Sequence, residues 1–218
     1  MDYKDTTVII PVKDELATEK VAMSVLKHLP NCRIIIIYKG EPHYNKVNAQ
    51  VKVVEQVGSG KGVACRQAVK LVKTPIMCFI DGDATYEPKD LRKLVGLVRE
   101  GADMVMGNRF ESISREAMPW YVQLGNHVLT VVANTLYFMH VKDSQTGIRA
   151  MKKSVFDAMK LRETHFGIET EMVVMAKKKG FKVVEIPAHY YKRIGQSKQM
   201  KLLDGLKLLA INFKFLLR

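Results

Sequence analysis

The sequence is poor in the features that identify secreted or membrane-spanning proteins. Its 218 residues include only three cysteines, Cys32, Cys65 and Cys78, and their spacing matches no metal-binding pattern. An odd number of cysteines, two of them in apolar surroundings, predicts free thiols in a reducing, intracellular compartment. No stretch approaches 18 consecutive apolar residues, so we expect no segment that crosses a membrane by itself.

A secretory signal is also missing from the start of the chain. Residues 1–5 do not combine a basic region with an apolar one. The N-terminus therefore gives no sign of export, and we expect a cytoplasmic protein.

Length and composition favour one globular domain. The chain is 47% hydrophobic and 26% charged, which is typical of a folded protein rather than a disordered one. A chain of 218 residues is long enough to bury a sizeable core. We find no internal repeat or low-complexity linker.

Short apolar runs alternate with longer segments of helical periodicity. We expect strands at residues 6–11, 33–38, 51–54, 76–80, 104–106 and 181–187, and helices at residues 16–29, 63–72, 88–98, 121–139, 168–179 and 199–218. Several of these strands are continuously apolar, which is typical of a parallel sheet covered on both faces. The pattern predicts an α/β fold with a mainly parallel sheet.

Two carboxylates directly follow one of these apolar strands. The run from Ile76 to Ile80 ends in Asp81, Gly82 and Asp83, at the sheet edge where open α/β folds bind ligands. Two neighbouring carboxylates repel each other unless a cation or hydrogen-bond donors lie between them, and Mg²⁺ prefers carboxylate oxygens together with substrate phosphates. An ordinary turn is the alternative, because Asp and Gly are common turn residues.

A glycine-rich loop, residues 58–62, precedes the second long helix. It is not a nucleotide P-loop, because Glu55 stands at the first glycine position and Gly62 stands where Ser or Thr follows the lysine. Glycines nevertheless let a backbone approach an anion closely, and Lys61 and Arg66 add positive charge. The loop therefore suggests a general anion site.

Two later segments are strongly amphipathic. Residues 121–139 place their strongly polar groups on one helical stripe, namely Gln123, Asn126, His127, Thr130 and Asn134. Residues 199–218 repeat the pattern with a narrow stripe of Lys201, Asp204, Lys207, Lys214 and Arg218. Such helices pack on a core, pair with a partner or lie in a membrane interface.

Positive charge is concentrated near the C-terminus. The formal net charge is +13, and residues 152–218 carry 15 Lys and Arg against 6 Asp and Glu. A basic patch can serve nucleic acid, an anionic membrane or phosphorylated substrates, or it can simply be a solvated surface. No aromatic side chains interleave with a basic stripe, so we expect no nucleic-acid partner.

Seven short motifs occur in an order that resembles a known enzyme family. They are Pro11 with Glu15, Gly60-Lys61-Gly62 with Arg66, Asp81-Gly82-Asp83, Gly107-Asn108-Arg109-Phe110, residues 143–149, Glu169-Thr170-Glu171-Met172 and residues 193–198. From residue 8 to residue 198 the chain resembles a family 2 glycosyltransferase of the A-type fold, and most closely a polyprenyl-phosphate (dolichyl-phosphate) hexose synthase. The resemblance implies inverting transfer of a hexose from a GDP- or UDP-sugar to the phosphate of a membrane polyprenol.

The resemblance also assigns residues to the donor site. Pro11, Val12, Glu15, Lys61, Asp81, Gly82 and Asp83 would bind the nucleotide-sugar. Asp83 would hold Mg²⁺ or Mn²⁺, with Asp81 as the alternative metal ligand. Asp83, Arg109 and Arg193 would be the catalytic residues, because a metal and guanidiniums stabilise the leaving diphosphate.

The acceptor side is assigned in the same way. Arg149, Ser197 and Lys198 would contact the acceptor or its phosphate. Residues 1–198 would form the catalytic domain and residues 199–218 an interfacial helix. The protein would then lie peripherally on the cytoplasmic face of a membrane, with a second copy or a membrane protein as a further candidate partner.

Three positions depart from the family pattern. Tyr38-Lys39 stands where many members carry an acidic pair, Thr85 replaces a Gln of the mannosyl enzymes, and Val122 stands where relatives place Arg. The resemblance therefore does not carry over recognition of the base, a third metal ligand or one acceptor-phosphate contact. Many relatives continue into transmembrane helices beyond the position of Arg218.

Two other functions remain open from the sequence. A phosphate acceptor is already ionised at neutral pH, so it hardly needs a general base. A soluble enzyme that glycosylates a hydroxyl needs a carboxylate base, and Asp143, Glu169 and Glu171 are the candidates. A basic binding module without catalytic activity is the third possibility.

Overall fold

A computed structural model describes residues 1–195 and 202–217. In this part of the chain one mixed sheet has the strand order β3-β2-β1-β4-β6-β5-β7. The strands are β1 (Thr6–Lys13), β2 (Arg33–Lys39), β3 (Val51–Glu55), β4 (Ile76–Phe79), β5 (Met104–Asn108), β6 (Arg149–Lys152) and β7 (Val183–Pro187). All neighbouring strands are parallel except for β6, which is antiparallel to β4 and β5. The predicted α/β fold with a mainly parallel sheet is confirmed.

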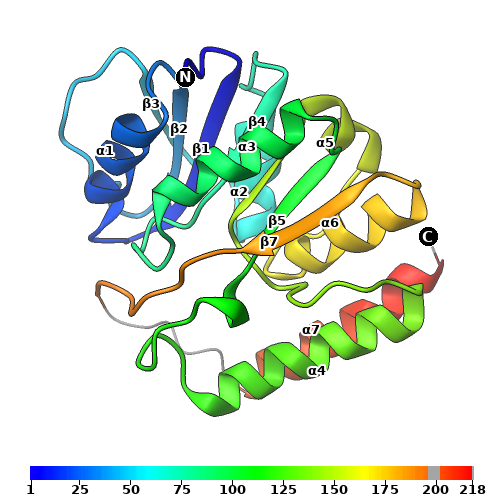
Figure 1. The fold of residues 1–218 in the computed structure, drawn as a ribbon. Helices are drawn as coiled ribbons and strands as arrows, with labels where there is room; N and C mark the ends of the chain where they lie inside the picture. The colour runs from blue at the N-terminus through cyan, green and yellow to red at the C-terminus, as the bar shows by residue number, and fades with distance from the viewer. Residues whose placement is uncertain (196–201, 218) are drawn as a thin grey trace.

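Helices cover both faces of this sheet (Figure 1). They are α1 (Thr18–His28), α2 (Lys61–Val69), α3 (Leu91–Arg99), α4 (Trp120–Tyr137), α5 (Lys153–Met159), α6 (Gly167–Lys178) and α7 (Leu202–Lys214), with short 3₁₀ turns at Pro88–Asp90, Arg109–Glu111 and Phe215–Leu217. Helices α1 and α3 pack on one face, and α2, α5 and α6 pack on the other. Helix α4 lies beyond α6, side by side with α7.

The apolar strands explain this double cover. In β2, Ile34 and Ile36 belong to the core beneath α1 and α3, whereas Ile35 and Ile37 belong to the core beneath α2 and α6. Successive side chains of a strand point to opposite faces, so a continuous isoleucine run needs apolar partners on both. The strand is accordingly buried throughout its centre.

The sequence pattern did not reveal β6 and α5. Strand β6 has four residues and begins with Arg149, so its apolar part is too short to produce a period. Helix α5 follows it directly and has only seven residues. Beyond these, the expected elements are present in the described residues with ends that move by a few residues. Residues 199–201 and 218 of the expected C-terminal helix lie outside the described residues.

Helix α7 packs on the domain as well as exposing apolar side chains. Its Leu208 and the following Phe215 are buried, and the Tyr137 hydroxyl of α4 donates to the carbonyl of Asn212. Phe213 and Leu216 are exposed. No helix in the described ranges is long and apolar enough to cross a bilayer.

Candidate functional site

The candidate site lies where β1 and β4 end side by side. Pro11 and Val12 occupy the end of β1, and Asp81 to Asp83 follow β4. The two strands are parallel neighbours, and the amide of Ile80 still donates to the carbonyl of Ile9. Since ligands bind at the carboxyl ends of parallel strands, this edge is the expected place for a site.

Asp83 is the most constrained carboxylate at this edge. It is 9% exposed, and its Oδ1 accepts hydrogen bonds from the Thr85 hydroxyl at 2.7 Å and the Thr85 amide at 3.1 Å. Its Oδ2 lies 3.5 Å from Nη1 of Arg193. Burial and the negative charge of Asp81 raise the pKa of Asp83. The negative charge of this carboxylate is therefore not fully compensated, even though Arg193 lies beside it.

Arg193 lies on a segment that runs beside the loop containing Asp83. The amides of Tyr191 and Ile194 donate to the carbonyls of Thr85 at 2.8 Å and Asp83 at 3.1 Å. The Arg193 guanidinium also pairs with Glu15, which follows β1. Two residues predicted for the donor site, Glu15 and Asp83, are thus joined through a third, Arg193.

Asp81 is paired with a different cation. The ammonium of Lys61 lies 2.6 Å from Oδ1 of Asp81 and 2.7 Å from Oε1 of Glu169. Burial lowers the pKa of Lys61, but the two carboxylates raise it well above its ordinary value. Lys61 therefore stays charged and links α2, α6 and the end of β4.

Glycines allow these segments to approach one another. A Cβ on Gly147 would lie 2.3 Å from Oδ2 of Asp81, so a side chain at this position would force the carboxylate to move. A Cβ on Gly62 would lie 2.1 Å from the backbone oxygen of Glu163. Gly62 therefore allows α2 to pack closely against residues 163–164, and the anion site suggested for this loop stays a prediction.

Two of the predicted arginines are occupied by the protein itself. Arg109 is buried and donates to Asp143 through Nε at 2.6 Å and Nη2 at 2.8 Å. Arg149 is 1% exposed, and its three nitrogens donate to the carbonyls of Ser144, Thr146 and Glu169. These contacts show that both side chains hold parts of the fold together, and the catalytic role of Arg109 and the acceptor role of Arg149 stay predictions.

Of the remaining predicted positions, the structure describes Gly82 but not Ser197 or Lys198. Gly82 lies between the two carboxylates, where an added Cβ would lie 2.3 Å from the Val12 side chain. Ser197 and Lys198 fall outside the described residues.

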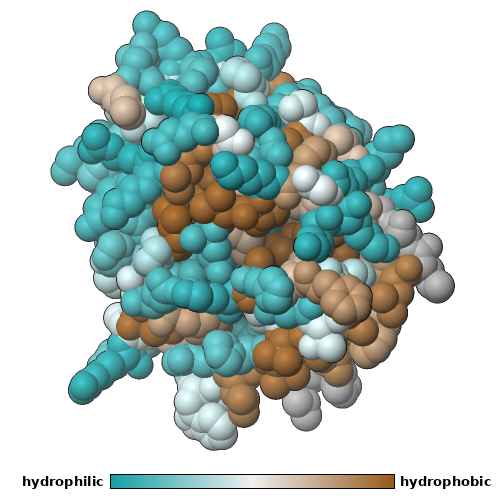
Figure 2. Space-filling view, turned by 45° about the vertical axis from the view of Figure 1, so that its right-hand side comes forward, coloured by the Kyte–Doolittle hydropathy of each residue, from teal (hydrophilic) through white to brown (hydrophobic). Residues whose placement is uncertain are grey.

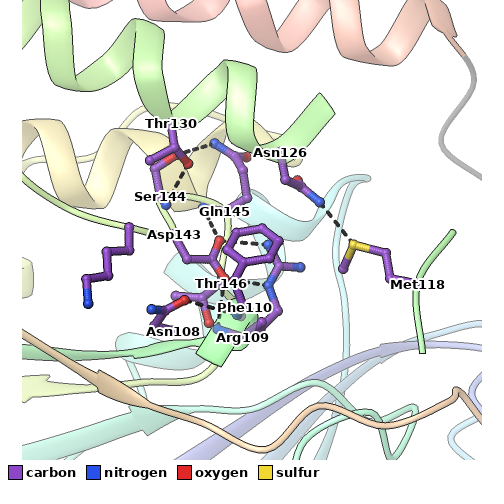
Figure 3. A network of polar contacts seen from close by, with 12 residues as sticks. Asn108, Arg109, Phe110, Met118, Asn126, Thr130, Asp143, Ser144, Gln145 and Thr146 are labelled. Carbon is purple, nitrogen blue, oxygen red and sulfur yellow. Dashed lines mark hydrogen bonds and ion pairs between the residues drawn. The ribbon is translucent and has the colours of Figure 1, made fainter. Parts of the chain in front are cut away.

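A polar network connects the candidate site to α4 (Figure 3). The hydroxyl of Thr130 on α4 lies 3.0 Å from the Ser144 hydroxyl and accepts the Ser144 amide at 3.1 Å. The Gln145 side chain then bridges Ser144 and Thr170 of α6. Thr130 thus joins α4 to the loop that contains Asp143 and Gly147, whereas Gln123 and Asn126 bond to Met118.

The opposite side of α4 is apolar and faces outward. Leu124, Val128 and Val131 are 56%, 46% and 58% exposed, and Trp120 and Tyr121 are exposed at the start of the helix. Figure 2 shows apolar surface gathered along the lower part of the molecule, where Figure 1 places α4 and α7. The amphipathic helix is therefore oriented with its polar stripe toward the protein.

The sequence did not show how two residues contribute to the site. Glu169, which belongs to one of the motifs and is a candidate base, anchors Lys61, and its other oxygen, Oε2, is buried without a hydrogen-bond partner in the described part of the chain. Tyr86 accepts the Gly147 amide at 2.7 Å and so fixes the loop against Asp81. The only signal for Tyr86 was its position directly after Asp83, Ala84 and Thr85.

The donor set suits a hard divalent cation that also binds phosphates. Within residues 1–195 and 202–217, no three His, Cys, Asp or Glu side chains converge as a complete metal site. Asp83 is buried, has a raised pKa and has Asp81 as its electrostatic neighbour. Mg²⁺ and Mn²⁺ accept one or two carboxylates together with substrate phosphates, so Asp83 with Asp81 fits such an ion.

Comparison with known proteins identifies relatives of the chain. Residues 7–159 match the family model for glycosyl transferase family 2. Glycosyltransferase AglJ of Haloferax volcanii is 37% identical over 147 residues, which are 67% of this chain and 48% of that protein. The dolichyl-phosphate hexose transferase of the same organism is 31% identical, again over 67% of this chain, and over 64% of its own length.

Solved structures share the fold. Glucosyl-3-phosphoglycerate synthase from Mycobacterium tuberculosis, in complex with Mg²⁺ and uridine diphosphate, has a TM-score of 0.72 at 15% identity and covers 96% of this chain and 78% of that one. A complex of the same enzyme with Mn²⁺, UDP-glucose and phosphoglyceric acid has a TM-score of 0.71. This likeness concerns the fold, and the chain spans about half the length of AglJ.

Proposed function

Because the chain belongs to glycosyl transferase family 2, we propose that it transfers a hexose from a GDP- or UDP-sugar to a polyprenyl or dolichyl phosphate at a membrane surface. The transfer would depend on Mg²⁺ or Mn²⁺ and invert the anomeric carbon. The dolichyl-phosphate hexose transferase among its relatives supports this choice of acceptor.

The orientation of α4 is the observation that carries the choice of a lipid acceptor. This helix contains no Asp, Glu, Lys or Arg, its Thr130 bonds to Ser144 of the site loop, and Leu124, Val128 and Val131 are exposed. An apolar helical face of this kind, with aromatic residues at one end, suits the boundary between lipid head groups and acyl chains. The Thr130–Ser144 contact joins this helix to the loop that reaches Asp81.

The donor diphosphate would meet Asp81 and Asp83. Asp83 would hold the metal ion, which neutralises charge that develops on the leaving diphosphate. Arg193 is the arginine best placed to contact this diphosphate, because it already lies beside Asp83. Lys61 would keep Asp81 in place, since Glu169 holds the ammonium from the other side.

The acceptor would need little activation by the protein. A phosphate monoester has a second pKa near 6 and is ionised at neutral pH. Its attack on the anomeric carbon from the face opposite the diphosphate inverts the configuration. The role left to the protein is to position the phosphate and exclude water.

Location at the cytoplasmic face of a membrane is part of the same proposal. The free thiols of Cys32, Cys65 and Cys78 are buried, which agrees with a reducing compartment. The apolar face of α4 could alternatively cover a second copy or a membrane protein. Binding to protein-free vesicles distinguishes lipid from these partners.

Glu169 favours one alternative function, glycosylation of a hydroxyl group by a soluble enzyme. Its buried Oε2 has no hydrogen-bond partner in the described residues and could accept a proton from a hydroxyl. In that case Glu169→Gln would lower kcat strongly with a hydroxyl acceptor. With a phosphate acceptor, the same variant would change kcat only indirectly, by altering the position of Lys61.

A thermal-shift panel of GDP- and UDP-sugars with Mn²⁺ tests the donor half of the proposal. A bound donor raises the melting temperature because it binds only the folded protein. We expect one of these donors to raise it, and the rise to disappear with EDTA. If no sugar nucleotide stabilises the protein, the assignment as a glycosyltransferase of this kind is contradicted.

A further inference from the structure

The carboxylates at the ends of β1 and β4 are neutralised by two cations that are held very differently. Lys61 lies between Asp81 and Glu169 at 2.6 and 2.7 Å and extends from α2. Arg193 reaches Asp83 at 3.5 Å from a segment outside the helices and strands. The contact between Asp83 and Arg193 is therefore longer than the contact between Asp81 and Lys61.

Asp83 is the carboxylate of this group that a divalent ion would share with Arg193. Asp81 pairs with Lys61, whereas Asp83 pairs with Arg193, which also contacts Glu15. The Arg193 guanidinium lies against the Oδ2 of Asp83, whereas Oδ1 is taken by Thr85. Arg193 and a metal ion on Asp83 would thus compete for the same oxygen.

We propose that Arg193 is a tethered cation that occupies the metal side of Asp83 until a nucleoside diphosphate arrives, and then passes from Asp83 to the diphosphate. This inference rests on the proposed function, because it takes the metal and the diphosphate as ligands of that site. Arg193 would then determine the order in which ligands bind, because the divalent ion enters together with the diphosphate rather than before it.

The backbone around Arg193 suits such an exchange. Hydrogen bonds from the amides of Tyr191 and Ile194 hold the segment beside Thr85 and Asp83. The side chain can therefore change partner while its backbone stays in place. Its Nε is buried and has no hydrogen-bond partner among the described residues, so the guanidinium retains a donor for a phosphate oxygen.

The exchange also prevents an unfavourable intermediate. A metal ion on Asp83 with Arg193 still in contact would place two cations on one carboxylate oxygen, where they repel each other. A diphosphate offers several anionic oxygens and can accept both. Metal binding without nucleotide is accordingly expected to be weak.

The test measures the binding of Mn²⁺ in the absence of nucleotide. Electron paramagnetic resonance detects this binding as a loss of the signal of the free ion. We expect Arg193→Gln to bind Mn²⁺ about tenfold more tightly than the unaltered protein, because a competing cation is removed. Arg193→Lys, which keeps the charge, should bind Mn²⁺ as weakly as the unaltered protein. Arg92→Gln, an exposed arginine on α3, controls for the change in net charge.

Each outcome decides the question. Equal or weaker Mn²⁺ binding by Arg193→Gln overturns the exchange, and a gain that persists after Asp83→Asn shows that the added Mn²⁺ binds elsewhere and overturns it too. Addition of UDP or GDP should tighten Mn²⁺ binding by the unaltered protein. If neither nucleotide binds, the proposed function fails, whereas nucleotide binding with unchanged Mn²⁺ affinity in Arg193→Gln defeats only the exchange.

Discussion

The hydroxyl of Thr85 donates to Oδ1 of Asp83 at 2.7 Å, and the backbone amide of the same residue donates at 3.1 Å. One oxygen of Asp83 is thereby fixed by a neighbour two residues away. The other oxygen faces Arg193. Thr85 is thus a positioning residue for the proposed metal ligand.

Thr85→Val is expected to weaken apparent Mn²⁺ affinity about tenfold, since a hydrogen bond to a charged group contributes roughly 1.5–3 kcal/mol. The maximal rate at saturating Mn²⁺ should change less. Thr85→Ser retains the hydroxyl and should behave like the unaltered protein. Transfer rates over a Mn²⁺ titration measure the effect, and equal titrations for Val and Ser would refute the positioning role.

Asp83→Asn is expected to lower metal-dependent transfer by about 10²–10³-fold, because the leaving diphosphate loses its charge stabilisation. Burial raises the pKa of Asp83 in the folded protein, so its contribution to stability is greatest at low pH and declines as the pH rises through that raised value. Removing the charge should therefore leave the melting temperature at pH 7 equal or higher. Full activity, measured against EDTA controls, would eliminate Asp83 as the metal ligand.

Arg109→Met is expected to destabilise the fold by about 3–5 kcal/mol, because it leaves the buried Asp143 carboxylate without its cation. Arg99→Met is the matched control, since Arg99 pairs with Asp5 near the surface and should cost under about 1 kcal/mol. Urea unfolding followed by circular dichroism gives both values. Unchanged stability with lost transfer would instead support the catalytic role predicted for Arg109.

The apolar face of α4 gives a membrane prediction. Leu124→Gln with Val131→Gln should reduce co-sedimentation with anionic vesicles about tenfold or more, because two exposed apolar side chains leave the lipid boundary. Val47→Gln with Val57→Gln changes two exposed valines elsewhere and should bind as before. Equal binding by both pairs would place the membrane contact outside α4.

These α4 variants are a cleaner test than removal of residues 199–218. Phe215 and Leu208 of the C-terminal segment are buried, so truncation would uncover the core as well as any lipid contact. The separation of residues 199–218 as an independent interfacial unit stays a prediction. Lys214 also pairs with Glu163 at 2.6 Å, which ties α7 to the loop beside α2.

The sequence predicted the sheet and the site edge because both depend on local patterns. Four consecutive isoleucines, Ile34 to Ile37, require cover on both faces, and Asp81 to Asp83 follow their strand directly. Strand β6 lacked such a pattern, since its first residue is a buried arginine whose side chain donates to the backbone carbonyls of Ser144, Thr146 and Glu169.

The partners of the charged groups could not be read from the sequence. Lys61 and Glu169 are more than a hundred positions apart, and Arg193 meets Glu15 across nearly the whole chain. Such pairs follow from how the strands and loops are assembled, not from spacing. Likewise, the polar stripe of α4 was visible in the sequence, but its orientation toward Ser144 was not.

The proposed acceptor is a phosphate at a membrane surface. The most direct measurement offers a labelled nucleotide-sugar, with Mn²⁺, to vesicles that contain polyprenyl phosphate in the presence of a water-soluble sugar alcohol. We predict label in the organic-extractable product, as an acid-labile hexosyl phosphate of inverted configuration. Label in the water-soluble product alone would contradict the account and favour the hydroxyl-directed enzyme.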